Sequence, residues 1–92
     1  MQYVWGPAKD TLNQRKHGLG LADGIPALED PRRDSWIDDR FDYAEERICN
    51  SGLERGECTL CCLNQWDEET IRIISVRKAE PDEIERYGLS NS

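Results

Sequence analysis

The first third of the chain changes from an alternating to a helical pattern of apolar positions. Residues 2–5 alternate, with Tyr3 and Trp5 on the same side, which predicts a short strand. Pro7 is tolerated in the first turn of a helix, and the spacing after it predicts a helix. This helix is expected to end at Gly18, since glycine suits the left-handed conformation found at helix termini.

The predicted first helix has two different sides. Ala8 and Leu12 lie one turn apart and mark the side that we expect to pack on the core. Residues 19–31 form a second, weaker helical segment, because Gly24 and Pro26 interrupt its apolar spacing. The positions i, i+4, i+7 and i+8 of the first helix form a polar, mostly basic stripe, which consists of Lys9, Asn13, Lys16 and His17.

Short apolar runs separated by polar turns fill the rest of the chain. Trp36 and Ile37 are expected to begin a strand, and residues 46–53 read as another that ends near Gly52. Residues 58–65 form a buried strand, and 70–77, rich in isoleucine, form the clearest one. Strands joined by such short turns predict an antiparallel meander.

Proline and acids at residues 80–83 favour the first turn of a short last helix, and residues 88–92 are expected to fray. The predicted class is therefore α+β: a strand, one or two helices, a meander of three to four strands, and a C-terminal helix. The helices are expected on one face of the sheet. Residues 1–92 are short enough that we expect one domain.

Composition narrows the function without choosing it. The chain has a formal net charge of -7, so it should bind nucleic acid weakly except at a local basic site. An acidic exterior suits a basic protein partner. No apolar run approaches the roughly 20 residues that span a bilayer, and the first residues lack a signal peptide's pattern. We therefore expect a cytoplasmic protein without a membrane partner.

The four cysteines are interpreted as structural thiols. Cys49, Cys58, Cys61 and Cys62 superficially suggest a metal site. Cys61 and Cys62 are adjacent in a predicted strand and should point to opposite faces, so three thiolates cannot converge easily. We expect small buried residues, neither disulfide-bonded nor bound to metal, in a reducing compartment.

Two separated segments carry a resemblance to a known family. The first comprises residues 3–9, Asn13 and residues 16–18, and the second comprises residues 71–79 followed by Tyr87. Together they resemble the BrnT-type toxins. The resemblance implies a RelE-like fold and a toxin that inhibits translation by cleaving RNA without a metal or other cofactor. It also implies attack by the ribose 2′-hydroxyl, and a cognate antitoxin, basic or DNA-binding, that neutralises the toxin.

The resemblance suggests which residues act. Arg72 and Arg77 join His17, whose ordinary pKa lies near neutrality, as candidate catalytic residues. His17 is either a general acid–base group or a residue that merely closes the helix. The arginines are five positions apart, so a regular strand would place them on opposite faces. The covered one would need a carboxylate, from Glu46 or the last helix, while the other could bind phosphate. Candidate substrate-binding residues are Lys9, Asn13, Lys16 and Arg47.

Departures from the family pattern leave a second function open. Gly6 stands where the family usually has an acid. The turn before the last strand, usually glycine and a basic residue, is acidic here and carries an exposed tryptophan suited to protein contact. The candidate partner-binding residues are Trp66, Asp67, Glu68 and Glu69. The alternative is a catalytically degenerate acidic protein that inhibits a nucleic-acid-binding complex, for example a phage anti-defence or anti-CRISPR protein.

Overall fold

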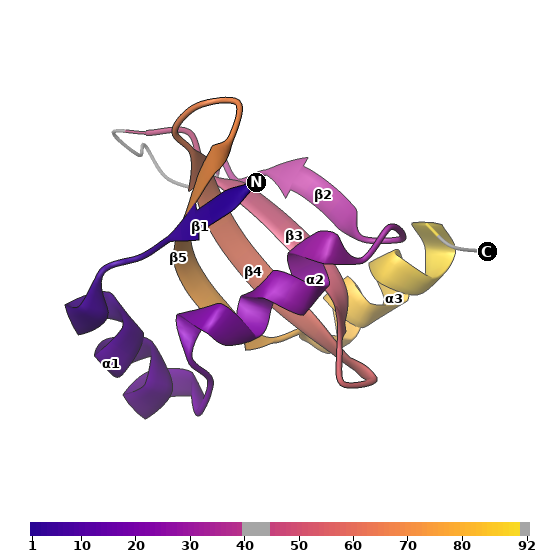
Figure 1. The fold of residues 1–92 in the computed structure, drawn as a ribbon. Helices are drawn as coiled ribbons and strands as arrows, with labels where there is room; N and C mark the ends of the chain where they lie inside the picture. The colour runs from indigo at the N-terminus through magenta and orange to yellow at the C-terminus, as the bar shows by residue number, and fades with distance from the viewer. Residues whose placement is uncertain (40–44, 91–92) are drawn as a thin grey trace.

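A five-stranded mixed sheet organises the chain, which the computed structural model describes at residues 1–39 and 45–90 (Figure 1). The strand order is β1-β5-β4-β3-β2. Four strands form the predicted antiparallel meander, whereas β1 pairs in parallel with the outer edge of β5. The strands are β1 (Gln2–Val4), β2 (Asp34–Ile37), β3 (Ile48–Glu54), β4 (Glu57–Gln65) and β5 (Thr70–Lys78).

The helices follow the predicted order. The first helix ends as expected: Gly18 has φ 73° and its N–H donates to the Gln14 carbonyl. The weak segment after it is a 3₁₀ turn continued by a short helix. The last helix runs to Ser90, so the fraying expected from residue 88 is wrong for 88–90, and residues 91–92 lie outside the described residues. The helical elements are α1 (Pro7–His17), η1 (Leu21–Gly24), α2 (Ile25–Glu29) and α3 (Pro81–Ser90).

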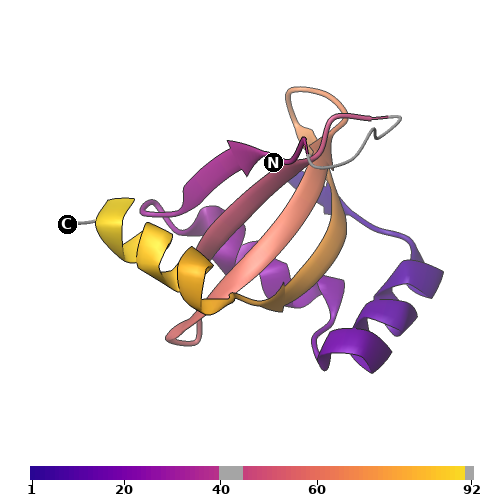
Figure 2. The same ribbon diagram turned by 180° about the vertical axis from the view of Figure 1, so that it is seen from behind.

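The helices cover both faces of the sheet, contrary to the prediction of one. η1 and α2 lie on one face, and α3 lies on part of the other, which we call the open face (Figures 1 and 2). The open face has an apolar cluster of its own, made of Cys49, Leu60 and Cys62 with Trp36 beside it, and this gives α3 something to cover. The larger cluster, under η1 and α2, contains Leu21, Leu28, Cys61, Leu63, Ile71, Ile73 and Val76.

Two glycines allow η1 and α2 to lie close to the sheet. A Cβ on Gly52 would come within 2.3 Å of the Ala27 carbonyl oxygen of α2. A Cβ on Gly24 would come within 2.7 Å of the Cys61 sulfur. The sequence suggested that the strand ends near Gly52. In the structure Gly52 lies inside β3, which continues under the helix to Glu54.

A β-bulge in β5 changes which side chains share a face. Leu63 of β4 pairs with Ile73, but its neighbour Cys62 pairs with Ser75, so Ile74 is an extra residue. The bulge shifts the alternation by one position. Val76 consequently returns to the covered core together with Ile73.

Arg72 and Arg77 therefore lie on the same face of the sheet, and the prediction of opposite faces is wrong. Arg72 pairs with Asn64 before the bulge, and Arg77 pairs with Leu60 after it. Both pairs belong to the open face, since Leu60 is part of its cluster. The predicted separation assumed an unbroken alternation, and one inserted residue reverses it.

The helix α1 is attached by a polar side chain. The expected apolar side is wrong: Leu12 is 61% exposed and Ala8 is also exposed. Asn13 is the buried residue of α1, and its amide donates hydrogen bonds of 2.7 Å to the Leu19 carbonyl and 2.8 Å to the Val76 carbonyl. Its carbonyl accepts the Val76 N–H at 3.1 Å. Asn13 thereby occupies the edge of β5 beyond the point where β1 ends.

Candidate functional site

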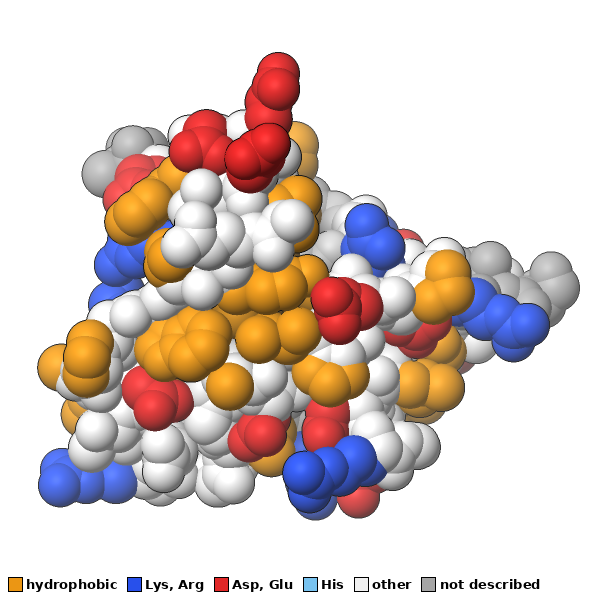
Figure 3. Space-filling view, in the orientation of Figure 1, with side chains coloured by type: hydrophobic (Ala, Val, Ile, Leu, Met, Phe, Trp, Pro, Cys, Tyr) orange, Lys and Arg blue, Asp and Glu red, His pale blue; other side chains and the backbone are white. Residues whose placement is uncertain are grey.

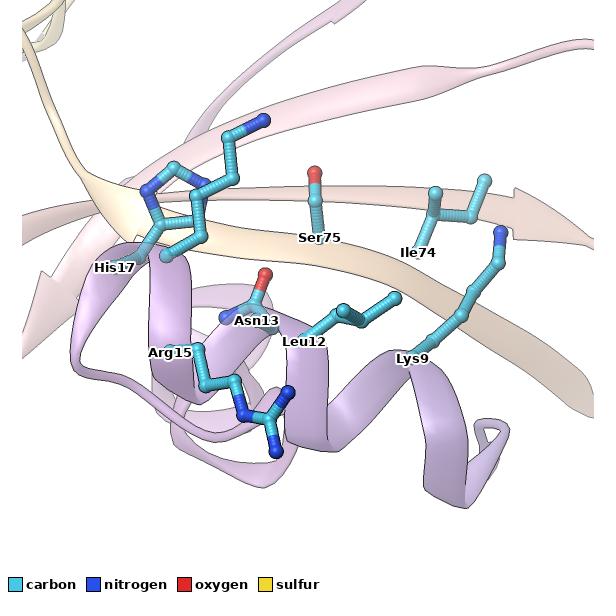
Figure 4. Close-up of a pocket in the computed structure, with 8 residues that line it drawn as sticks. Lys9, Leu12, Asn13, Arg15, His17, Ile74 and Ser75 are labelled. Carbon is cyan, nitrogen blue, oxygen red and sulfur yellow. The ribbon is translucent and has the colours of Figure 1, made fainter.

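A cleft of about 530 Å³ lies between α1 and β5 (Figure 4). The helix contributes basic side chains, because the stripe expected from the sequence faces the strand here. The strand contributes the bulged Ile74 and the hydroxyl of Ser75, which the bulge turns to the open face. The residues that line it are Lys9, Leu12, Asn13, Arg15, Lys16, His17, Ile74 and Ser75.

His17 is the titratable group of the cleft with a pKa nearest neutrality. It is the last residue of α1 and is partly buried. Burial lowers its pKa below the usual 6.5, and the positive charges of Lys16 and Arg77 lower it further. The imidazole is therefore mostly neutral at pH 7, which is the form that accepts a proton. His17 is also the last residue of α1, as the second alternative expected, while its role in acid–base catalysis remains a prediction.

The other stripe residues differ in what they can do. Lys9 and Lys16 are exposed and point their charges into the cleft region. Asn13 also lines the cleft, but both ends of its amide are hydrogen-bonded to backbone atoms of Leu19 and Val76. Its substrate-binding role remains a prediction, while its structural role is plain.

Arg77 is held by the C-terminal helix. Its Nη1 and Nη2 donate to the two carboxylate oxygens of Glu83 at 2.8 and 2.9 Å, with 24% and 13% of the two side chains exposed. The hydrogen bonds that Arg77 donates to Glu83 raise the pKa of Arg77. An acid of the last helix was the expected partner of an arginine on the helix-covered face, but Glu83 pairs with Arg77 on the open face, because α3 lies on that face. The guanidinium acts on the cleft through its charge on His17.

Arg72 lies farther along the same face, outside the α1–β5 cleft. Its Nη1 is 3.6 Å from Oε1 of Glu45, whose side chain is 54% exposed. Arg72 lines a second pocket, of about 330 Å³, with Val4, Trp5, Gly6 and Trp66.

The remaining predicted residues are not brought into the cleft. Arg47 is partly buried just before β3, and its carbonyl accepts the Asp38 N–H at 2.8 Å. Trp66 is 58% exposed at the end of β4. The turn from β4 to β5 presents acidic side chains at the top of the molecule in Figure 3, and these are Asp67, Glu68 and Glu69.

The cysteines lie in β3 and β4 as free thiols. Cys61 and Cys62 belong to the two different apolar clusters, as their adjacency predicted. Cys62 lies across from Cys49, with the sulfur atoms 2.6 Å apart. Burial raises the pKa of Cys61, which keeps it protonated. Within residues 1–39 and 45–90, no three side chains of His, Cys, Asp or Glu converge in a metal-binding arrangement.

Sequence reasoning missed half of the cleft. Ser75 was matched to the family pattern but was not chosen as a site residue, and Leu12, Arg15 and Ile74 were not considered. The cleft depends on the bulge, and an isoleucine-rich strand gives no local sign of where an extra residue falls. The signal that was available is the helical stripe, which did identify Lys9, Lys16 and His17.

The fold and the cleft define a class: a small α+β protein that presents basic side chains at one edge of its sheet on an otherwise acidic chain. A sequence profile described as "Ribonuclease toxin, BrnT, of type II toxin-antitoxin system" matches residues 5–83. The chain therefore belongs to the BrnT family of ribonuclease toxins of type II toxin–antitoxin systems. Membership implies a cognate antitoxin, and the alternative of a degenerate acidic inhibitor is not favoured.

A solved structure shares the fold. The crystal structure of the Brucella abortus ribonuclease toxin BrnT superposes with a TM-score of 0.64 and 24% sequence identity, over 87% of this chain and 97% of that one. No curated protein sequence matches the chain significantly. Among the described residues, no helix has the length and apolar character needed to cross a bilayer.

Proposed function

We propose that this protein is an endoribonuclease that cleaves RNA in the cleft between α1 and β5 without a metal ion. Cleavage inhibits translation in the cytoplasm, and a basic or DNA-binding antitoxin neutralises it. The observation that carries the proposal is the cleft itself: Lys9, Arg15, Lys16 and His17 line one cavity of a chain whose net charge is -7. Basic side chains gathered so locally on an acidic chain fit an anionic substrate.

The basic side chains of the cleft can attract a phosphate at short range despite the net negative charge of the chain. At physiological ionic strength the Debye length is about 8 Å, so acids on the far side of the domain are screened from a phosphate in the cleft. The lysines and Arg15 meet that phosphate directly. Long-range repulsion by the acidic body slows non-specific encounters with RNA, so binding depends on entry into the cleft.

The chemistry follows from the protonation states. Neutral His17 accepts the proton of a ribose 2′-hydroxyl, and the 2′-oxygen attacks the adjacent phosphorus. The P–O5′ bond breaks, and a lysine ammonium of the cleft protonates the leaving 5′-oxygen. The products are a 2′,3′-cyclic phosphate and a 5′-hydroxyl. Lys16, next to His17, is the candidate acid, since a single histidine cannot serve in both roles.

The proposal is tested with His17→Asn, which keeps a polar group of similar size but removes the titration. We expect RNA cleavage to fall about 10²- to 10⁴-fold and growth arrest to disappear, with an unchanged melting temperature. Gln14→Ala, in an exposed position of the same helix, is the control. The reaction should resist EDTA and leave a cyclic phosphate. Wild-type protein that is harmless in cells and inert towards RNA at micromolar concentration would reject the proposal.

The pH profile gives a second readout of the same residue. Because neutral His17 is the active form, activity should fall as the pH drops through its lowered pKa, below 6.5. Lys16→Gln removes one of the charges that lower this pKa, so the acid limb should move to higher pH. If Lys16→Gln leaves the acid limb in place, the titrating group is not His17.

Three broader points are part of the proposal. Residues 1–92 act as one domain, and the sheet is related to that of RelE-like toxins. The acidic turn of Asp67, Glu68 and Glu69 is a candidate contact for the basic antitoxin. Support for the last point comes from the exposure of these acids and from the overall charge. Charge reversal in the turn, followed by a neutralisation assay, tests it.

A further inference from the structure

A second pocket on the molecule has a composition that the cleavage chemistry does not use. It measures about 330 Å³ and is lined by Val4, Trp5, Gly6, Trp66 and Arg72. Trp66 is 58% exposed. An indole is a large, mostly apolar side chain that is usually buried or bound to a partner. Trp5 packs against the covered core and also forms a wall of this pocket. Two indoles and a guanidinium therefore meet at one opening.

The pocket continues the α1–β5 cleft along the same strand. Arg72 and Ser75 both belong to the open face of β5, and the strand rise places them roughly 10 Å apart. Trp5 and Gly6 directly precede α1, whose Lys9 lines the cleft. An RNA strand that lies in the cleft and follows β5 reaches the pocket with a neighbouring nucleotide.

The side chains suit an unpaired base. Aromatic rings stack on any nucleobase, and guanidinium groups bind phosphate or stack as well. The position of Gly6 is open, since a Cβ built there would meet no atom within 4 Å. The surrounding packing therefore does not require a glycine at this position.

Two acidic features of this region are compatible with such a ligand. The turn acids follow Trp66 in sequence, but a nucleobase is neutral and is not repelled by them. Glu45 competes for Arg72, but its side chain is 54% exposed and its carboxylate lies 3.6 Å away, so solvent weakens the pair. A phosphate can displace it.

We propose that the pocket of Trp5, Trp66 and Arg72 is a base-binding subsite. It stacks one unpaired nucleobase of single-stranded RNA on Trp66, with Arg72 contacting the adjoining phosphate. The inference rests on the proposed ribonuclease function and adds where the substrate strand leaves the cleft. It makes Trp66 a substrate-positioning residue that takes no part in proton transfer.

The test separates binding from cleavage. A 2′-O-methyl RNA oligonucleotide cannot react at the 2′ position, so its affinity reports binding without cleavage, and the difference between variants reports the subsite. Trp66→Ala should weaken its binding roughly 5- to 150-fold, the range of one lost base stack, and Trp66→Phe should retain most of the affinity. With cleavable RNA, Trp66→Ala should raise KM and leave kcat unchanged. Ile37→Ala is the matched control, since Ile37 is also 58% exposed but lies on the far edge strand β2.

Each outcome decides one of the two proposals. Unchanged binding and KM in Trp66→Ala, with an active wild type, overturn the subsite and leave the ribonuclease intact. If Trp66→Ala instead loses only its inhibition by antitoxin, the tryptophan is a protein contact and the subsite is wrong. A wild type that binds the oligonucleotide through Trp66 but never cleaves RNA sustains the subsite and rejects the nuclease. Absence of both binding and cleavage rejects both.

Discussion

At the scale of single residues, polar side chains perform tasks that the sequence pattern assigns to apolar ones. Asn13 attaches α1 to the sheet: its side-chain amide makes three hydrogen bonds to backbone atoms, and two of these pair with Val76 at the edge of β5 as a neighbouring strand would. Leu12, next to it, remains 61% exposed and lines the cleft. A helix with such an attachment can keep a basic surface, because its docking does not require an apolar stripe.

Replacing Asn13 by alanine should therefore destabilise the protein. The change leaves the Val76 N–H and two carbonyl groups without partners, and a buried unsatisfied group costs about 1–3 kcal/mol. Urea unfolding measures the loss, and faster hydrogen exchange of the Val76 amide should accompany it. Gln14→Ala removes only an exposed hydrogen bond to Asp10 and serves as the control. Equal unfolding midpoints for the two variants would contradict the role of Asn13.

At the scale of elements, the bulge in β5 decides the chemistry of the open face. With Ile74 inserted, Ser75 and Arg77 face the same side as Arg72, and Val76 completes the covered core. If Ile74 were instead paired as a regular strand residue, strict alternation would bury Arg77 and expose Val76. The extra residue thus links the stability of the sheet to the placement of the site.

Deletion of Ile74 tests this link. Because Ile74 is the extra residue, its deletion leaves a regular strand in which Val76 stays in the core and Ser75 and Arg77 stay on the open face. We therefore expect the deletion variant to fold with the native pairing of β4 and β5. Ile74→Ala keeps the bulge and should also remain folded, since Ile74 is only partly buried. Circular dichroism and two-dimensional NMR measure the fold of both variants. An unfolded deletion variant would show that the sheet requires the bulge itself.

Polar contacts also hold α3 in place. Arg86 lies 4.5 Å from the ring centre of Trp36 and forms an ion pair of 2.6 Å with Asp34. Tyr87 donates to the Asp30 carboxylate at 2.6 Å, and this bond raises the pKa of Tyr87 to about 12. Only a small apolar cluster lies beneath the helix, so these contacts set its position over the open face.

At the scale of the whole molecule, α3 and α1 lie at opposite sides of the open face, with β5 carrying the arginines between them (Figure 2). Arg77 belongs to the side of α3 through its pair with Glu83. Arg72 belongs to the pocket beside the cleft. The two arginines share a face but have different neighbours: Arg77 joins β5 to α3, whereas Arg72 lines the pocket and pairs with Glu45.

Substitution of the two arginines should separate these roles. Arg77→Ala removes charge-assisted hydrogen bonds to the half-buried Glu83 and should cost about 1.5–3 kcal/mol of stability. Arg72→Ala removes a longer pair with the 54% exposed Glu45 and should cost less than about 1 kcal/mol while weakening RNA binding. Thermal melts and RNA titrations of both variants measure the difference. The double variant Arg77→Ala with Glu83→Gln should recover part of the lost stability. Similar melting temperatures for the two single variants would refute the assignment.

The sequence by itself determined the elements, the family and part of the site. Local signals place the first helix between Pro7 and Gly18, and short polar turns place the meander, because caps and turns depend on residues close together in the chain. The helical stripe identified Lys9, Lys16 and His17 for the same reason: on a helix, residues three and four apart share a side whatever surrounds it.

The tertiary structure alone decided which faces meet. The bulge at Ile74, the parallel pairing of β1 and the position of α3 on the open face all depend on partners distant in sequence. Arg72 and Arg77 share a face for this reason. Ser75 lines a cleft that α1 and β5 form together, and Trp66 lines a pocket that residues 4–6 and β5 complete. In a strand, one inserted residue reverses every later side chain, so the composition of a site cannot be inferred until pairing has set the register.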